Sequence, residues 1–330
     1  MPDKVPTAKA LAWPLFDAVV ASAPLRGLNP WEGGRFVPDL DTLRTLLGVP
    51  LHLNAPTRSG VPALALDVWV AYELRRVGFD PDAVWPRAQP PRVIARDVLE
   101  FVRGVTPAAT RNQLLERLQK GSGPGNVGGA SANILGKNYL KQVDVILSGW
   151  QTGPELLVST KRMDSSFGKN AANRVEESYG DAKNLALRHP MAAMGFLYSM
   201  RSTAYTEERR QFDWIVDLLG KLGREEDAYD ACCLVVPEWD GAGPSDGGGD
   251  VEAPAPIEPD DVELEELGAE TSRDAIESVI ASLPKVDLRR DLVPDHLTPE
   301  AFFTTMVNHV LDSTPITMHE SARHLRSAGR

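Results

Sequence analysis

The sequence predicts a mixed α/β protein in which a mixed central sheet is flanked by helices. Two observations support this fold class. From residue 111 onward, helix-like and strand-like patterns follow one another in the order α-β-β-β-α-β-α-β. The chain has 330 residues and is 42% hydrophobic, which is enough to bury a substantial core. Helical patterns before and after this segment predict a helical N-terminal region and C-terminal helices.

The chain divides into four predicted segments. These are a mostly helical region at 1–109, the α/β core at 110–239, an acidic flexible linker or loop at 240–270, and helices at 271–330. In the first segment, helices are expected at Ala8–Val20, Asp41–Leu47, Val61–Val77 and Val93–Val105, with a Pro-rich connector at Asp80–Arg92. The helix Val61–Val77 is the strongest of these, because Pro62 lies in its first turn and Gly78 follows its end.

Patterns in the core segment give its expected elements. Helices are predicted at Arg111–Lys120, from Ser165 or Ser166 to Arg188, and at Thr206–Leu222; strands are predicted at Asn133–Tyr139, Gln142–Leu147, Glu155–Arg162, Met194–Met200 and Cys232–Val236. The C-terminal helices are expected at Thr271–Leu283, Thr298–Asp312 and Thr317–Ser327.

A glycine-rich run at Gly121–Ser131 contains a literal G-x-G-x-x-G. A dinucleotide-binding loop must leave a strand and open a helix. Here a helix precedes the run and a strand-like segment follows it, which is the reverse order. A flexible loop that closes on a substrate is therefore the favoured interpretation.

Charge is unevenly spread along the chain. The net charge is −11, and Asp240–Glu270 alone holds eleven carboxylates and no Lys or Arg. Residues 111–224 carry sixteen Lys and Arg against eleven Asp and Glu, so the overall acidity does not argue against nucleic acid as a partner.

Two further features bear on the compartment. No apolar run reaches the roughly 18 residues that a membrane span needs, and the N-terminus lacks a signal-peptide pattern. We therefore expect a cytoplasmic protein with no membrane contact. The adjacent Cys232 and Cys233 lie in an apolar run and are expected to be buried thiols.

Three charged residues around the predicted hairpin suggest a metal-dependent phosphodiesterase centre. Asp144 lies in the first hairpin strand, Lys161 ends the second, and Glu176 follows in the next helix. Hydrolysis of a phosphodiester needs a divalent cation, an activated water and positive charge near the phosphorus oxygens. Magnesium prefers carboxylate oxygens and keeps several waters, so one or two acids are sufficient to hold it.

The expected register brings these groups together. If Leu147 pairs with Leu156, Asp144 lies opposite Ser159, with Cβ atoms about 5 Å apart. Ser159 and Lys161 then share one face of their strand. On the helix, Glu176 lies beside the edge that packs on the sheet, whereas Glu177 points further outward.

This arrangement resembles the PD-(D/E)XK nuclease superfamily over about residues 110–236. Two positions differ from the usual pattern: Val143 precedes the aspartate in place of proline, and Ser159 replaces the acid of E-x-K. The S-x-K form resembles a subgroup of type II restriction endonucleases that supplies the missing carboxylate from the following helix. The resemblance implies a restriction-endonuclease-like core in which Asp144 and Glu176 ligate Mg²⁺, Lys161 activates the water and Ser159 lines the site.

Further residues near this centre complete the predicted site. Lesser candidates for the second carboxylate are Glu155, Asp164 and Glu177. Candidate contacts to DNA phosphates or base edges are Lys137, Lys141, Arg162, Lys169, Asn170, Asn173 and Arg188. The alternative is that these residues are ordinary solvated groups, and the same alternative stands for Asp144, Lys161 and Glu176.

The resemblance implies a Mg²⁺-dependent, sequence-specific endonuclease that acts on double-stranded DNA. It would leave 5′-phosphate and 3′-hydroxyl ends, act as a homodimer and work beside a protective DNA methyltransferase. One alternative is a defence nuclease that acts on modified or phage DNA without such a methyltransferase. Another, suggested by Ser159, is a catalytically inactive nuclease fold that binds DNA or a protein.

Overall fold

The computed structural model describes residues 7–119, 128–129, 132–165, 167–224, 228–241, 243 and 273–330, without the side chains of 119, 168–174 and 273. The predicted glycine-rich loop and acidic linker fall almost wholly outside these residues, as does the predicted helix cap Ser166. Within the described ranges, no helix is both long enough and apolar enough to cross a membrane.

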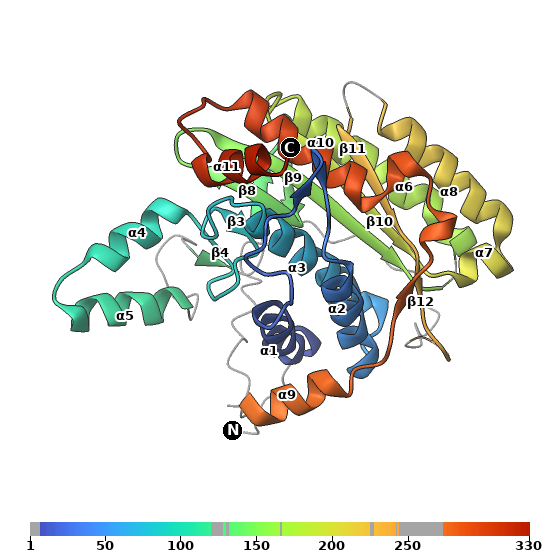
Figure 1. The fold of residues 1–330 in the computed structure, drawn as a ribbon, viewed down its shortest axis with the longest axis horizontal. Helices are drawn as coiled ribbons and strands as arrows, with labels where there is room; N and C mark the ends of the chain where they lie inside the picture. The colour runs from blue at the N-terminus through green and yellow to red at the C-terminus, as the bar shows by residue number, and fades with distance from the viewer. Residues whose placement is uncertain are drawn as a thin grey trace.

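Helices and strands alternate along most of the chain (Figure 1). The helices are α1 (Ala8–Ala21), α2 (Leu40–His52), α3 (Val61–Arg76), α4 (Arg96–Gly104), α5 (Ala108–Gln119), α6 (Phe167–Ala186), α7 (Thr203–Glu207), α8 (Arg209–Leu222), α9 (Arg273–Ala281), α10 (Pro299–Ser313) and α11 (Glu320–Ala328), with 3₁₀ turns η1 (Thr57–Ser59), η2 (Arg290–Leu292) and η3 (Asp295–Leu297). The strands are β1 (Trp31–Glu32), β2 (Arg35–Phe36), β3 (Val84–Trp85), β4 (Val93–Ile94), β5 (Gly128–Gly129), β6 (Ala132–Leu135), β7 (Leu140–Val143), β8 (Val145–Gly149), β9 (Gly153–Met163), β10 (Ala193–Met200), β11 (Ala231–Val235), β12 (Pro237–Glu238) and β13 (Asp287–Leu288).

A five-stranded mixed sheet forms the centre of the molecule, with strand order β11-β10-β9-β8-β3. β8 is antiparallel to both of its neighbours, β3 and β9, whereas β10 is parallel to β9 and β11 is parallel to β10. Every residue of β10 and β11 is buried, as expected for parallel strands covered on both faces. The predicted pairing of Leu147 with Leu156 is confirmed.

The structure corrects the first of the three strands predicted before the long helix that begins at Ser165 or Ser166. The segment Asn133–Tyr139 contributes β6, which pairs with β7 in a separate two-stranded hairpin. The edge strand of the central sheet is β3, inside Asp80–Arg92, where the sequence predicts an extended connector. A two-residue strand between prolines shows no alternation of apolar and polar residues, so periodicity cannot detect it. The predicted strand Gln142–Leu147 is also interrupted, because the chain passes from β7 to β8 at Asp144.

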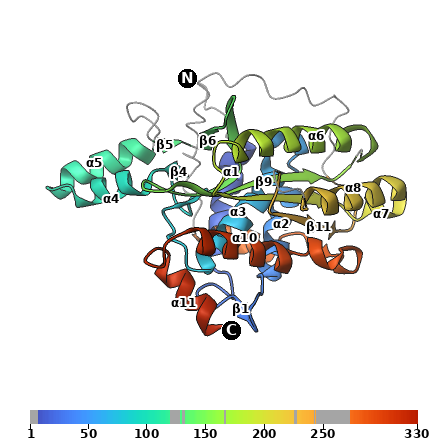
Figure 2. The same cartoon turned by 90° about the horizontal axis from the view of Figure 1, so that it is seen from above.

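Helices cover both faces of the sheet (Figure 2). α3 and α10 pack on one face, with α1 and α2 beyond α3. α6 and α8 cover the other face. Alternate residues of β9 enter the two cores: Leu156 and Val158 belong to the α3 side, whereas Leu157 and Met163 belong to the α6 side.

One core joins the N-terminal helices, the sheet and the C-terminal helices. Phe303 of α10 stacks on Phe36 at 4.9 Å between ring centroids and meets Trp69 of α3 edge-on at 5.2 Å. All three are fully buried, and they belong to the same apolar cluster as the α3-side residues of β8 and β9. The predicted segments 1–109, 110–239 and 271–330 therefore share a core.

Helix ends follow the sequence signals only in part. The predicted helix Val93–Val105 begins at Arg96, because Val93 and Ile94 form β4, and the helix predicted at Asp41–Leu47 continues to His52. α3 begins with Pro62 in its first turn, and Gly78 follows its end at φ +99°, as predicted for Val61–Val77. The predicted helix Thr206–Leu222 is divided into α7 and α8 at Glu208, whose φ of −128° and ψ of 50° are not helical. The last predicted helix, Thr317–Ser327, is shorter at its start and begins at Glu320.

α4 and α5 form an arm, residues 96–119, that projects from the body of the molecule (Figures 1 and 2). The two helices pack around a small apolar cluster of Ile94, Leu99, Val102 and Leu118 that is separate from the main core. The arm corresponds to the predicted helix pair.

Candidate functional site

Asp144 lies at the junction of the β6–β7 hairpin and the central sheet. Its Oδ2 accepts a hydrogen bond from the backbone N–H of Thr160 on β9, at 2.8 Å. The pairing of Val145 with Val158 sets Asp144 beside Ser159, as the sequence predicts. Burial raises the pKa of Asp144, while the positive charge of Lys161 and the hydrogen bond from Thr160 oppose that rise.

Lys161 and Ser159 share the α6 face of β9 with Leu157 and Met163. Both side chains are partly exposed. The side chain of Lys161 makes no hydrogen bond or ion pair with another described residue. Its ammonium group nevertheless lies close enough to Asp144 to lower the pKa of that carboxyl, so the predicted Asp144 and Lys161 are neighbours.

Asp67 of α3 is a third charged residue here, and the sequence prediction does not include it. Thr160 donates its hydroxyl to Asp67 Oδ1, from the face of β9 opposite Ser159 and Lys161. Burial and the charge of Asp144 raise the pKa of Asp67 well above its usual value, against the opposing effects of Thr160 and Lys161. The available signal is the position of Asp67, an isolated acid within the apolar run from Val61 to Val70.

Asp181 is the acid that α6 places nearest to this centre. It is buried, its Oδ2 is 2.5 Å from Lys141 Nζ, and its Oδ1 accepts the hydroxyl of Tyr139 at 3.0 Å. Its negative charge adds to the rise in the pKa of Asp144. The sequence signal is helical spacing, because Asp181 directly precedes Ala182 and lies four residues before Leu185, two apolar residues that pack on the sheet.

The predicted carboxylates other than Asp144 are placed elsewhere. Glu176 is exposed on α6, and no hydrogen bond or ion pair joins it to a described residue. Glu155 is 2.5 Å from His319 Nε2, Asp164 is 2.9 Å from Arg162 Nε, and Glu177 is 3.3 Å from Lys141 Nζ. None of these four acids contacts Asp144 or Lys161 in the described part of the chain.

The predicted DNA-contacting residues separate into three groups. Lys137 and Arg188 are exposed, and Lys141 is partly buried beside Asp181. Arg162 is buried at 2% exposure, where it binds Asp164 and the carbonyl of Pro62, so this position argues against its predicted contact with DNA. The side chains of Lys169, Asn170 and Asn173 lie outside the described part of the structure.

The arrangement offers carboxylate oxygens for a metal ion. Asp144 Oδ1 and Asp67 Oδ2 make no hydrogen bond with a described residue, while the other oxygen of each is held by Thr160. Among the described residues, no group of three or more His, Cys, Asp or Glu is close enough to hold a metal ion. Two carboxylates are nevertheless sufficient for Mg²⁺, because it retains waters and binds substrate phosphate. The pair Asp67 and Asp144 could therefore hold Mg²⁺ more readily than a metal whose ligands all come from the protein.

Comparisons with protein-family models, with curated proteins and with solved structures gave no match for this chain. The fold and the geometry of the site are therefore the basis for a functional argument. They show a mixed sheet flanked by helices and, at one junction of that sheet, the buried Asp67 and the partly buried Asp144 close to Lys161.

Proposed function

We propose that this chain is a Mg²⁺-dependent endonuclease that hydrolyses double-stranded DNA. The observation that carries the proposal is the shared binding of Asp67 and Asp144 by Thr160, the residue directly before Lys161. Two acids near a lysine supply the ligands and the positive charge that phosphodiester hydrolysis needs. Perturbed carboxyl pKa values in such a cluster are typical of functional sites.

The strand connections also support the resemblance to PD-(D/E)XK nucleases. The five strands of the central sheet and the helices α3, α6 and α8 occur along the chain in the order α-β-β-β-α-β-α-β. This order leaves out the inserted elements β4, α4, α5, β5, β6 and β7 between β3 and β8, and α7 before α8. The central sheet combines three neighbouring antiparallel strands with two parallel strands beyond β9, the strand that carries Lys161. This order of elements is the one that the resemblance implies, provided that α3 and β3 take the places of the helix predicted at Arg111–Lys120 and the strand predicted at Asn133–Tyr139.

Each residue has a defined task in the proposed mechanism. Asp144 and Asp67 would hold Mg²⁺, which supplies Lewis-acid polarisation of the phosphodiester and of an attacking water. Lys161 would orient that water and donate hydrogen bonds to the phosphate oxygens as negative charge develops. Thr160 fixes both carboxylates through its amide and hydroxyl. Ser159, on the lysine's face, would line the substrate side, and Asp181 would keep Lys141 in place.

Finer features of the proposal come from the resemblance alone. They are sequence-specific cleavage of the type II restriction kind, 5′-phosphate and 3′-hydroxyl ends, a homodimer and a partner methyltransferase. A defence nuclease that cuts phage or modified DNA would use the same centre. A gene for a methyltransferase beside that of this chain would favour the restriction role, because the host genome then needs protection.

A second candidate is a nuclease fold that binds DNA or a protein without cleaving it. Two observations favour it: Ser159 replaces the usual acid, and no group of three possible metal ligands occurs among the described residues. The two candidates differ in one outcome, the breakage of phosphodiester bonds.

The test is to incubate the purified full chain with unmethylated plasmid and with phage DNA, in Mg²⁺ and in EDTA. The proposal predicts cleavage only in Mg²⁺, with uniform 5′-phosphate ends on sequencing. Lys161→Ala should lower cleavage by about 100-fold or more, whereas Lys221→Ala, an exposed lysine of α8, should leave it unchanged. Binding of DNA without cleavage in Mg²⁺ would support the second candidate instead.

A further inference from the structure

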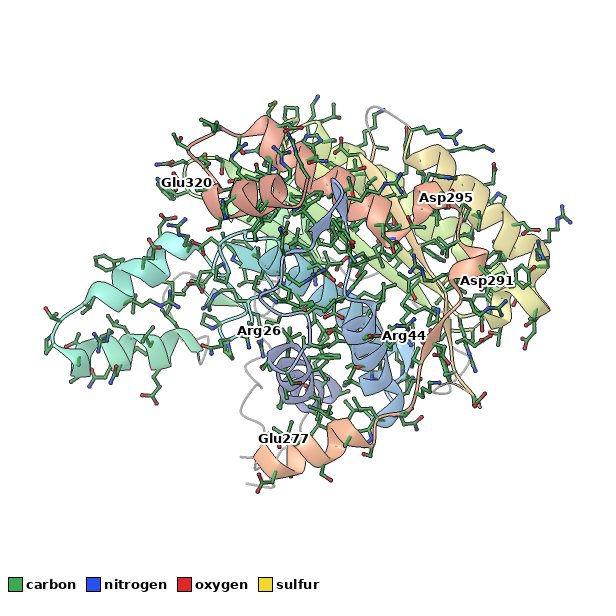
Figure 3. The ribbon with its side chains drawn as sticks, in the orientation of Figure 1. Arg26, Arg44, Glu277, Asp291, Asp295 and Glu320 are labelled. Atoms are coloured by element: carbon green, nitrogen blue, oxygen red, sulfur yellow. The ribbon has the colours of Figure 1, made fainter. Side chains whose placement is uncertain are left out.

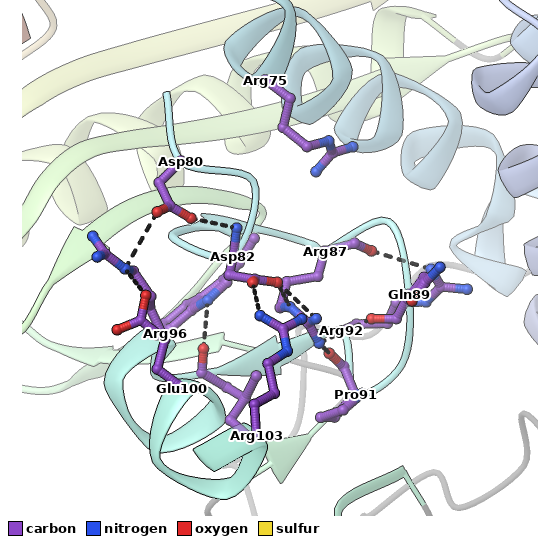
Figure 4. A network of polar contacts seen from close by, with 12 residues as sticks. Arg75, Asp80, Asp82, Arg87, Gln89, Pro91, Arg92, Arg96, Glu100 and Arg103 are labelled. Atoms are coloured by element: carbon purple, nitrogen blue, oxygen red, sulfur yellow. Dashed lines mark hydrogen bonds and ion pairs between the residues drawn. The ribbon is translucent and has the colours of Figure 1, made fainter. Parts of the chain in front are cut away.

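A cluster of arginines lies where the α4–α5 arm joins the body of the molecule. Arg75 lies in the last turn of α3, Arg87 and Arg92 belong to the segment between β3 and β4, and Arg26 follows α1. Figure 4 shows Arg75 with its guanidinium directed toward the loop that carries Arg87 and Arg92. In a chain of net charge −11, this is a local excess of positive charge.

The carboxylates near the cluster are already bound by other arginines. Asp17 forms a two-pronged pair with Arg92, at 2.8 and 3.0 Å. Asp82 accepts from Arg87 at 2.8 Å and from Arg103 of the arm at 2.5 Å (Figure 4). These pairs account for the fixed position of Arg87 and Arg92.

Arg75 differs from these arginines because it has no carboxylate partner among the described residues. Its Nη1 donates to the carbonyl of Pro86 at 2.9 Å, and no other donor of its guanidinium is used there. A guanidinium carries five N–H donors. Arg75 is only partly buried, and none of its nitrogens is among the buried atoms without a partner, so the unused donors are accessible to an anion from solvent.

Electrostatics agree with this geometry. Burial lowers the pKa of Arg75 to about 10. The positive charges of Arg92, Arg87 and Arg26 contribute to the same shift, and the negative charge of Asp17 opposes it. Arg26 is exposed, on the side of the body from which the arm projects (Figure 3), and uses one donor for the carbonyl of Ala21. Arg75 and Arg26 thus offer unused donors in a positive field.

We propose that Arg75 and Arg26, backed by Arg87 and Arg92, form a binding site for a phosphate-type oxyanion. Guanidinium groups bind phosphate oxygens in a planar, two-pronged geometry, which explains the use of arginine here. The same chemistry would recognise a phosphate of a nucleic-acid backbone or a free phosphate. The proposal does not depend on cleavage by Asp144 and Lys161.

Thermal unfolding of the full chain in sodium phosphate and in sodium chloride of equal ionic strength tests the site. Specific binding to the folded state raises the Tm in phosphate relative to chloride. Arg75→Gln should lower this difference to the general stabilisation that phosphate gives a folded protein, because glutamine removes the charge, and Arg26→Gln should reduce it. Arg209→Gln, an exposed arginine of α8 paired with Asp213, should retain the full difference.

A second measurement identifies the source of the phosphate and does not require cleavage. Anisotropy of a labelled DNA duplex in EDTA gives the affinity for nucleic acid. If the site binds the DNA backbone, Arg75→Gln lowers the affinity of the protein for the duplex by about tenfold, and free phosphate competes with the duplex for the wild type. If the site takes free phosphate, Arg75→Gln leaves the affinity for the duplex unchanged and lowers only the difference in Tm between phosphate and chloride. An equal phosphate effect in wild type and Arg75→Gln, or no effect in either, would overturn the proposal.

Discussion

Asp67 of α3 and Asp144 before β8 are bound by the same residue, Thr160, through its hydroxyl and its backbone N–H. The relationship brings two acids from distant parts of the chain together. Burial raises the pKa of both carboxyl groups, and for Asp67 the charge of Asp144 adds to that rise. Two carboxylates so close together cost free energy when both are charged, which makes this pair the first target for mutation.

Replacement of Asp67 should separate stability from activity. Asp67→Asn keeps an oxygen to accept the hydroxyl of Thr160 and removes the charge that burial and Asp144 disfavour. We expect the free energy of unfolding in urea to rise by about 1–2 kcal/mol. DNA cleavage in Mg²⁺ should fall by at least about tenfold, because a proposed ligand is lost.

Asp295→Asn provides the matched control, since Asp295 is exposed at the start of η3. It should change neither stability nor cleavage. A stabilised Asp67→Asn variant with full cleavage would remove Asp67 from the mechanism and leave it as a buried acid without a catalytic task.

Much of the fold could be predicted from periodicity, but the sheet edge could not. β9, β10, β11, α3 and α6 are long enough to show a pattern of apolar residues, and the sequence predicts each of them. β3 has two residues, and its place at the edge depends on pairing with β8. Such a strand is fixed by tertiary contacts rather than by its own residues.

The candidate site was predictable only where its residues are close in sequence. Asp144, Ser159 and Lys161 belong to one hairpin, so the strand register brings them together. Asp67 is 93 residues from Thr160 along the chain, and no local pattern predicts that contact. Asp181 and Glu176 are on the same helix, and a difference of five residues decides which side chain faces the sheet.

Lys141 should contribute measurably to stability through Asp181. Burial lowers the pKa of Lys141, but its hydrogen bond to Asp181 and the charges of Asp181 and Glu177 raise it overall. Lys141→Met leaves Asp181, only 10% exposed, without its cation. We expect a loss of about 2 kcal/mol in the free energy of unfolding.

Lys221→Met breaks the exposed pair with Asp217 on α8 and should cost about 0.5 kcal/mol or less. Equal losses of unfolding free energy in the two variants would contradict the claim that the pair Lys141–Asp181 stabilises the fold more than an exposed pair does.

The β6–β7 hairpin is held to α6 by a close approach at Gly136. A Cβ at this position would lie 2.0 Å from Asn184 Nδ2. Asn184 cannot easily move, because it accepts from the N–H of Asn138 at 2.8 Å and donates to the carbonyl of Tyr139 at 3.1 Å.

Gly136→Ala should therefore lower the Tm and cost about 1–3 kcal/mol of unfolding free energy. Gly180→Ala is the control on α6, where a new Cβ meets no atom within 4 Å. Alanine favours a helix over glycine by about 1 kcal/mol, so this variant should be more stable than the wild type. A neutral Gly136→Ala would show that the hairpin can move away from the helix.

His309 should make the stability of the fold depend on pH. Its Nδ1 on α10 is 3.0 Å from Asp230 Oδ1, and Asp230 Oδ2 accepts the N–H of Met194 on β10 at 2.7 Å. The hydrogen bond to Asp230 raises the pKa of His309, although partial burial opposes it; the charges of Asp230 and Asp312 add to the rise. The folded state therefore binds the imidazole proton more tightly than the unfolded state does.

The sign of the effect follows from linkage. A raised pKa in the folded state gives stability that is fully present below the unfolded value of about 6.5 and is lost as the pH rises through the folded value. His309→Gln should thus destabilise the protein by roughly 0.5–1.5 kcal/mol in acid and by less above neutrality, as measured by urea unfolding across that range. His324→Gln, an exposed histidine of α11, should give no pH-dependent difference from wild type. A deficit in His309→Gln that stays constant with pH would indicate lost packing rather than a lost charged pair.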